Sequence, residues 1–466
     1  MSIDRDLNEG SVGHALISVS APMTLGILGV LSVGLADAFF LARHSDASLA
    51  AIGFVYPVIV ALVSLSIGLS AGTNTVVSQA IGKGERGAKR QRLTLHAMGL
   101  AATMACTVSL VFYLAAPWLF SLMGAKGDVL DAILGYVPYW CLSFPPMVTG
   151  MALNATFRAA GRSGVAATVM AVQAVLNIAL DPLFIFGMAG LPALGAEGAG
   201  LATFLARGIA FLGLLTFALH QGAIRLDCAP LTDLRKSIRR IARVGLPAAL
   251  SNAINPAGMA AVTAAVAVVG DAAVAGFGAA ARVQSILFVP MLALSSGIGP
   301  VVGQAWGAER YERAREAMRL SVLICLGYGL SLAIALLVFA TPIATLMTGG
   351  DGAAPYTAQY LRIVGWGFFG YGILVTANAA MNARDRALWS MGLSVARIAV
   401  IFVPFAWLGV WLWEYNGALL AALTANVIGA WAALIATRAT GLLHLDWWPI
   451  GLPARQIART LPTGTN

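Results

Sequence analysis

The sequence is poor in charged residues. Asp, Glu, Lys and Arg make up 11% of its 466 residues, against about 25% in an ordinary soluble domain. Because 59% of the residues are hydrophobic and the mean hydropathy is +0.83, this shortage of charge excludes both a soluble globular protein and a disordered one. A membrane-spanning helix needs about 20 apolar residues, so the chain is long enough for a dozen. We therefore predict an all-α polytopic membrane protein.

The sequence also lacks the motifs of the common enzyme classes. It contains no HExxH, no GxSxG and no Walker phosphate-binding loop. Its four cysteines, at positions 106, 141, 228 and 325, do not have the spacing of metal ligands. We expect no enzymatic activity and no cofactor, so any pumping must be driven by an ion gradient.

Twelve apolar segments follow one another along the chain. They predict a first lobe of six spans over 1–221, a cytoplasmic linker over 222–243, a second lobe of six spans over 244–438 and a cytoplasmic tail over 439–466. Since six is an even number, each lobe begins and ends on the same side of the membrane. The segments fall near 14–42, 49–80, 93–117, 129–157, 165–187, 198–220, 244–269, 272–306, 317–341, 355–382, 387–411 and 416–437.

The basic residues predict the orientation. Of 29 Lys and Arg residues, 23 lie in the N-terminal tail, the loops after even-numbered spans and the C-terminal tail, whereas the loops after odd-numbered spans hold only Arg43 and Lys126. By the positive-inside rule both termini are cytoplasmic, and we expect the protein in the plasma (inner) membrane. The net charge of +9 therefore reflects topology, and we expect no nucleic-acid partner.

The two halves of the chain repeat one another at a nearly constant offset in the numbering. VVSQAIGKGERGAKR at 76–90 matches VVGQAWGAERYERAR at 301–315, and Pro22 pairs with Pro247. Several such matches in order at one offset indicate a duplication. Because each half enters from the same side, the repeat is parallel, with its axis along the membrane normal and a cavity expected between the two lobes.

Asp37 and Asp181 are the two acidic residues that lie well inside apolar spans. A carboxylate at membrane depth costs several kcal/mol, so by default it faces a cavity and serves an ion or a proton. Both lie roughly 10 Å inside the outer boundary at 1.5 Å per residue, so they can share one site. The alternative is a packing role with an arginine such as Arg207 of the sixth span. At the repeat offset the second lobe has Val262, and a position near Phe405, in place of these acids, so we expect ion coupling in the first lobe alone.

Other polar residues lie on the same spans. Gln173, Asn177 and Asp181 are spaced i, i+4 and i+8 on one face of the fifth span. Tyr139 and Asn154 lie on the fourth span, about four helical turns apart and therefore on roughly one face. Thr203 lies on the sixth span, where a hydrogen bond to its own helix would explain its presence equally well. These three residues are further candidates for the polar cluster.

Pro22 lies before Asp37 on the first span, about 22 Å along the helix at 1.5 Å per residue. A proline removes one backbone hydrogen bond and leaves a point where a helix can bend. We therefore consider Pro22 a hinge that turns neutralisation of Asp37 into closure of the lobe. The alternative is that Pro22 and Pro247 only shape packing in a duplicated fold.

The passage NIALDPLFIFG followed by GAEGAGLAT, together with FRAAGRS after the fourth span, resembles the multidrug and toxic compound extrusion family, most closely its DNA-damage-inducible-F-like (DinF-like) branch. The resemblance implies export of cationic, lipophilic compounds in exchange for H⁺ or Na⁺, and we expect the protein to act as a monomer. Asp37 and Asp181 would be the coupling site, with Asn177, Asn154 and Tyr139 in the polar cluster around them.

One departure from the family guides the choice of ion. The sodium-coupled branch of that family has acidic residues on spans seven and ten, and this chain has none there. We therefore favour H⁺ as the coupling ion and keep Na⁺ as the alternative. A lipid-linked oligosaccharide flippase of the same superfamily is a further alternative, for which a markedly cationic central cavity would be expected.

Overall fold

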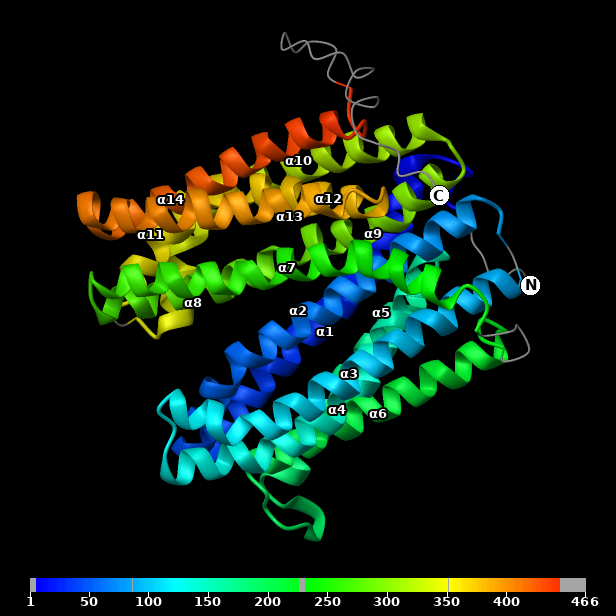
Figure 1. The fold of residues 1–466 in the computed structure, drawn as a ribbon. Helices are drawn as coiled ribbons and strands as arrows, with labels where there is room; N and C mark the ends of the chain where they lie inside the picture. The colour runs from blue at the N-terminus through cyan, green and yellow to red at the C-terminus, as the bar shows by residue number, and fades with distance from the viewer. Residues whose placement is uncertain (1–5, 86, 226–230, 351, 445–466) are drawn as a thin grey trace.

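The computed structural model describes residues 6–444 except 86, 226–230 and 351, and the regular structure of these residues is helical throughout. The helices form two lobes that meet near the start of the first helix and the end of the last one (Figure 1). We call this the terminal end of the molecule. Toward the opposite end, where the α1–α2 and α3–α4 turns lie, the lobes diverge like the arms of a V. We call this the open end.

The first lobe, or N-lobe, consists of six continuous helices. The polar breaks between them fall close to the boundaries expected from the apolar segments. The helices are α1 (Val12–His44), α2 (Asp46–Gly82), α3 (Ala88–Leu122), α4 (Gly127–Ala159), α5 (Ser163–Ile185) and α6 (Ala196–His220).

The second lobe, or C-lobe, also has six spans, but three of them are irregular. α8 and α9 meet at a bend of 45°, a 3-10 turn separates α11 from α12, and a π-helical segment, 396–402, joins α13 to α14. The helices are α7 (Leu234–Ala267), α8 (Asp271–Leu287), α9 (Val289–Gly307), α10 (Tyr311–Thr348), α11 (Ala354–Val364), α12 (Phe368–Ala383), α13 (Ala387–Val395) and α14 (Val403–Ala439).

The predicted number of spans agrees with this architecture. Within the described residues, eight helical stretches are long and apolar enough to cross a membrane alone, and the bent α8–α9 pair makes a ninth. One of the eight, 387–439, contains two spans, because Trp413 and Glu414 have non-helical backbone angles and turn the chain back on itself. The other two spans are α4 and α7, which are 33 and 34 residues long but less apolar.

The boundary between the lobes differs from the expected linker. α7 begins at Leu234, well before the predicted start of the second lobe, so the linker 222–243 is partly helical. The reason is an apolar stripe at helical spacing, since Leu234, Ile238 and Ile241 alternate with basic residues and Ile241 is 1% exposed. α14 ends at Ala439, close to the expected end of the lobe, and most of the predicted tail, 445–466, lies outside the described residues.

The lobes contact one another through α2, α7 and α9. At Gly68 and Gly72 of α2, a side chain would collide with the backbone of Gly245 and Ile241 on α7. Glycine is required at these positions because two helix backbones approach closely there. This contact closes the terminal end of the molecule.

Two buried glutamines add hydrogen bonds across the same interface. Gln79 of α2 donates from Nε2 to the carbonyl oxygen of Ala383 (2.8 Å) in the C-lobe. Its repeat partner Gln304 of α9 donates from Nε2 to the carbonyl oxygen of Ala159 (2.7 Å) in the N-lobe, and its Oε1 accepts from the backbone N–H of Leu7 (3.0 Å). The repeated VVSQA and VVGQA segments therefore form a nearly two-fold symmetric junction, in which each lobe binds a helix end of the other.

Candidate functional site

The two acidic residues that the sequence places deep in the N-lobe face each other. Asp37 lies on α1 and Asp181 on α5, which pack side by side, and their carboxyl groups are close enough to interact with one another. Asp181 is 0% exposed, and neither of its oxygens accepts from an N–H or O–H donor among the described residues. Because burial and mutual repulsion disfavour two negative carboxylates in one site, this arrangement is suited to holding a shared proton.

Asn177 and Thr203 fix the orientation of this pair. Asn177 lies one turn before Asp181 on α5 and is 2% exposed. In the amide orientation that satisfies the hydrogen-bond network, its Nδ2 donates to Asp37 Oδ1 (3.2 Å), and its oxygen accepts from Thr203 Oγ1 (3.2 Å) on α6. A chain of hydrogen bonds thus links α1, α5 and α6 through Asp37, Asn177 and Thr203.

Tyr136 of α4 and Arg207 of α6 complete the cluster. Tyr136 is 7% exposed, and its phenol interacts electrostatically with both carboxyl groups and with Arg207. Arg207 donates from Nη1 to Ser143 Oγ (2.8 Å) on α4, and its positive charge also acts on Asp37. Arg207 therefore ties α6 to α4 and places a positive field beside the acid pair.

The other polar residues expected in this cluster lie elsewhere. Asn154 lies far beyond Tyr136 on α4, about 27 Å along the helix at 1.5 Å per residue. It is therefore near the terminal end and does not join the acids. Tyr139 lies one turn from Tyr136 and packs beside Gly200 of α6. Gln173 follows the α5 face one turn farther from the acids than Asn177 and is half-buried.

Reasoning from the sequence missed Tyr136. Tyr139 was paired with Asn154 because their spacing places both on one face of the helix. That spacing does not show which residue of the face lies at the same level in the membrane as the acids. Depth is the signal that would have found Tyr136. It lies about 14 Å from the start of α4, and Asp37 lies about 10 Å from the end of α1. Both ends belong to the same side of the lobe, so these two residues are close to one level.

Pro22 lies where α1 crosses from its own lobe onto the other one. α1 is continuous across this proline. Next to it, Met23 is buried in a cluster with Ala166 of α5 and Ala293 of α9, and Gly297 of α9 leaves no room for a side chain against Ser20. A bend at Pro22 would therefore move the upper part of α1 relative to both lobes.

The C-lobe contains a polar cluster of its own, centred on a guanidinium group. Arg397 lies in the π-helical segment, is 7% exposed and donates from Nη1 to Asn426 Oδ1 (3.1 Å) on α14. Its Nη2 donates to Asn255 Oδ1 on α7, and its Nε has no partner among the described residues. The guanidinium also lies 5.7 Å from the ring centroid of Tyr371, which stacks on Phe288.

Two repeated six-span lobes that meet at one end of the molecule, with a polar cluster inside each, define a two-lobed membrane transporter. The family model for MatE matches residues 22–183 and 247–408, one stretch in each lobe. The first match begins at Pro22 and the second at its repeat partner Pro247, which confirms the duplication expected from the sequence. The chain belongs to the multidrug and toxic compound extrusion (MATE) family.

Relatives and solved structures agree with this assignment. The FAD transporter of Shewanella oneidensis is 32% identical over 420 residues, which cover 90% of this chain and 92% of that protein. The probable multidrug resistance protein NorM of Thermotoga maritima is 25% identical over 410 residues, covering 85% and 88% of the two chains. The crystal structure of the Vibrio cholerae MATE transporter VcmN in the bent form matches with a TM-score of 0.86 and 28% identity over 92% of this chain and 97% of that one.

Proposed function

We propose that this protein is a secondary antiporter that exports organic compounds across the plasma (inner) membrane in exchange for H⁺. The observation that carries this proposal is the pair of neighbouring carboxyl groups, Asp37 and Asp181, in a buried site of the N-lobe, because a shared proton removes the repulsion between them. Loss of the proton leaves two negative charges side by side in a buried site, which is unfavourable unless a cation or a rearrangement compensates for them. Proton release and substrate binding are therefore linked through this site.

In the proposed orientation both termini are cytoplasmic, as the distribution of basic residues predicts. The end at which the lobes diverge then faces outward (Figure 1). Asp37 lies about 10 Å from the outer end of α1, on the side from which external protons would enter. Protonation there would release the exported compound, and the return of the protonated transporter to an inward-open state would deliver the proton to the cytoplasm.

Cationic, lipophilic compounds are the substrate class that the acid pair favours. Once deprotonated, the pair presents negative charge to a cation, and protonation removes that attraction. Exchange of the proton for the cation then follows because both compete for the same negative charge. The relative of Thermotoga maritima is named a probable multidrug resistance protein, which agrees with this class.

A flavin dinucleotide is the second candidate, and a different observation favours it. The relative of Shewanella oneidensis, at 32% identity, is named an FAD transporter. In this chain the buried guanidinium of Arg397 has the chemistry to bind a phosphate group. Tyr371 and Phe288 stack with 4.3 Å between their ring centroids, an arrangement suited to a flat aromatic ring system.

We further propose that the protein acts as a monomer, without an enzymatic activity and without a cofactor. Every step described above uses only the carboxyl pair, the residues that orient it and the movement of the two lobes. No covalent chemistry is needed for exchange along an ion gradient.

Uptake into everted membrane vesicles tests the proposal. A fluorescent lipophilic cation and FAD would be offered separately, with pH and Na⁺ gradients imposed one at a time. We expect uptake that follows the proton gradient, persists without Na⁺ and collapses with a protonophore. Uptake that survives the protonophore and requires a Na⁺ gradient would contradict proton coupling, and the compound that accumulates identifies the substrate class.

A further inference from the structure

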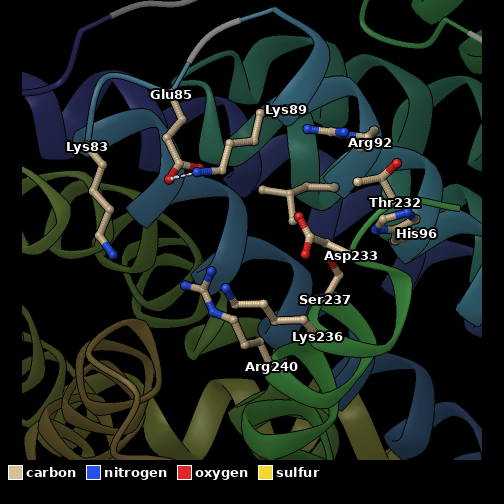
Figure 2. Close-up of a pocket in the computed structure, with 11 residues that line it drawn as sticks. Lys83, Glu85, Lys89, Arg92, His96, Thr232, Asp233, Lys236, Ser237 and Arg240 are labelled. Atoms are coloured by element: carbon tan, nitrogen blue, oxygen red, sulfur yellow. Dashed lines mark hydrogen bonds and ion pairs between the residues drawn. The ribbon is translucent and has the colours of Figure 1, made fainter. Parts of the chain in front are cut away.

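A second charged site lies at the terminal end, away from the acid pair. It is a cavity of about 410 Å³ between the α2–α3 turn, the first turns of α3 and the start of α7 (Figure 2). Among the described residues, five lysine and arginine side chains line it, from both sides of the junction between the lobes. They are Lys83, Lys89 and Arg92 on the N-lobe side, and Lys236 and Arg240 on α7.

The acidic residues of the cavity do not neutralise these charges. Of the two that line it, Glu85 forms an ion pair with Lys89 (2.7 Å). Among the described lining residues, Asp233 then supplies one negative charge against the four positive charges of the remaining lysine and arginine groups. Figure 2 shows the charged ends of Lys236 and Arg240 extending together from one side of α7, toward the side of the cavity on which Lys83 lies. Like charges repel when they converge, so this arrangement favours an anion between them.

We propose that this cavity binds a phosphate group and thereby joins the two lobes at the terminal end. Phosphate suits the site because a guanidinium binds its oxygens in pairs while lysine ammonium groups supply point charges. The cavity lies at the ends of membrane-spanning helices, where a phosphate is presented either by the headgroup of an anionic lipid or by a soluble phosphorylated compound. The shared chemistry is the phosphate group, and the experiment below separates its two sources.

A bound phosphate would affect the transport cycle through its position. Lys83 and Arg92 move with the N-lobe, whereas Lys236 and Arg240 belong to the helix that begins the C-lobe. An anion held by both sets opposes separation of the lobes at this end, and so favours the state seen in this structure. The binding itself does not depend on the transport activity, while its effect on the cycle rests on the proposed function.

The chain offers a matched control for testing this site. Lys236→Gln together with Arg240→Gln removes two charges from the cavity. Arg235→Gln together with Arg239→Gln removes two charges from the same turns of α7 at exposed positions that do not line the cavity. Both double variants change the net charge equally, so a difference between them reports the cavity and not general electrostatics.

Binding of pyrophosphate to the purified protein in detergent would be measured by titration calorimetry at low and at physiological salt. We expect the double variant of the cavity, Lys236→Gln with Arg240→Gln, to bind pyrophosphate at least about tenfold more weakly, as for the loss of charge-assisted hydrogen bonds. The control double variant, Arg235→Gln with Arg239→Gln, should change the affinity less than about twofold. Lys236→Arg, which keeps the charge, should bind nearly as tightly as the unmodified protein. Equal losses in the two double variants, or no binding to the unmodified protein, would overturn the proposal.

A second measurement identifies the source of the phosphate. The protein would be reconstituted in nanodiscs of phosphatidylcholine with or without phosphatidic acid, and the lipids retained would be counted by native mass spectrometry. The source is a lipid headgroup if phosphatidic acid is retained, if pyrophosphate displaces it, and if the Lys236→Gln and Arg240→Gln double variant no longer retains it. Pyrophosphate binding that is unaffected by phosphatidic acid assigns a soluble compound. Because neither measurement needs an ion gradient, failure here is distinct from failure of the antiport proposal.

Discussion

In the N-lobe, α1 and α5 bring two carboxyl groups together, whereas the equivalent positions in the C-lobe are Val262 and Ala406, both 0% exposed. The C-lobe instead holds Arg397 between two asparagines. Its partner Asn255 lies before Val262 on α7, about 10 Å along the helix. One duplicated architecture thus carries negative groups in one half and a positive group in the other. Duplication fixed the positions of the helices, and the chemistry of each half then depended on a few buried side chains.

The junction between the lobes shows the opposite behaviour. Gln79 and Gln304 occupy equivalent positions and bind equivalent helix ends of the other lobe. Symmetry is therefore retained where the lobes hold one another and is lost where we propose that ions or substrates bind. Comparing substitutions in the two halves separates these roles.

The largest effect is expected at the acid pair. Asp37→Asn and Asp181→Asn each preserve volume but remove an ionisable group, so each should abolish transport against a gradient while leaving folding largely intact. The double variant should be little worse than either single one, as for groups that act as a unit. Proton-driven uptake in vesicles measures this. Asp271→Asn, at an exposed position at the start of α8 in the other lobe, is the control and should transport normally; active export by the Asp37→Asn variant would show that the coupling site lies elsewhere.

The next largest effect concerns Arg397 and depends on the substrate. If the C-lobe cluster receives a phosphate group, Arg397→Gln should raise the KM for FAD at least about tenfold, since the charged hydrogen bonds are lost, and change transport of a lipophilic cation far less. Arg397→Lys keeps the charge but not the paired geometry and should be intermediate. The ratio of the two KM values is the readout, because general destabilisation of the lobe would impair both substrates alike.

A smaller effect is expected at the symmetric junction. Replacing either glutamine with leucine leaves a buried carbonyl oxygen of the other lobe without a donor, at a cost of about 1–3 kcal/mol. Gln304→Leu should lower the apparent melting temperature more than Gln79→Leu, because Gln304 also accepts from the backbone of Leu7. Gln221→Leu, at the exposed end of α6, is the control. A junction variant that melts like this control would show that these bonds do not hold the lobes together.

Much of this molecule was predictable from sequence because lipid imposes simple rules. Apolar length gave the spans, and the cost of a buried carboxylate identified Asp37 and Asp181. Tyr136 gave no such signal, since a tyrosine in an apolar helix is equally at home in packing. The partners of Arg397 were out of reach as well, because Asn255 and Asn426 come from distant helices and meet only through the fold. The π-helical segment and the bends of the C-lobe likewise depend on tertiary packing rather than on local composition.

The smallest effect concerns the two prolines that the duplication placed at equivalent positions. Pro22 lies on α1 about 22 Å below Asp37, beside the contact of Met23 with both lobes. Pro247 lies on α7, where Gly245 packs tightly against Gly68 of α2, so its role is confined to the closed junction. The missing N–H of a proline weakens the helix at that point, and only α1 carries a proposed coupling carboxyl group that can use such a weakness.

Pro22→Ala should therefore slow transport several-fold more than Pro247→Ala, while substrate affinity in detergent stays nearly unchanged in both variants. The affinity is spared because the acid pair and its hydrogen bonds lie far from either proline, whereas the rate depends on how easily α1 bends between the two states. Transport rates in vesicles and equilibrium binding in detergent are the two measurements. Equal slowing by the two substitutions would assign both prolines to packing, and no slowing by either would remove the hinge from the mechanism.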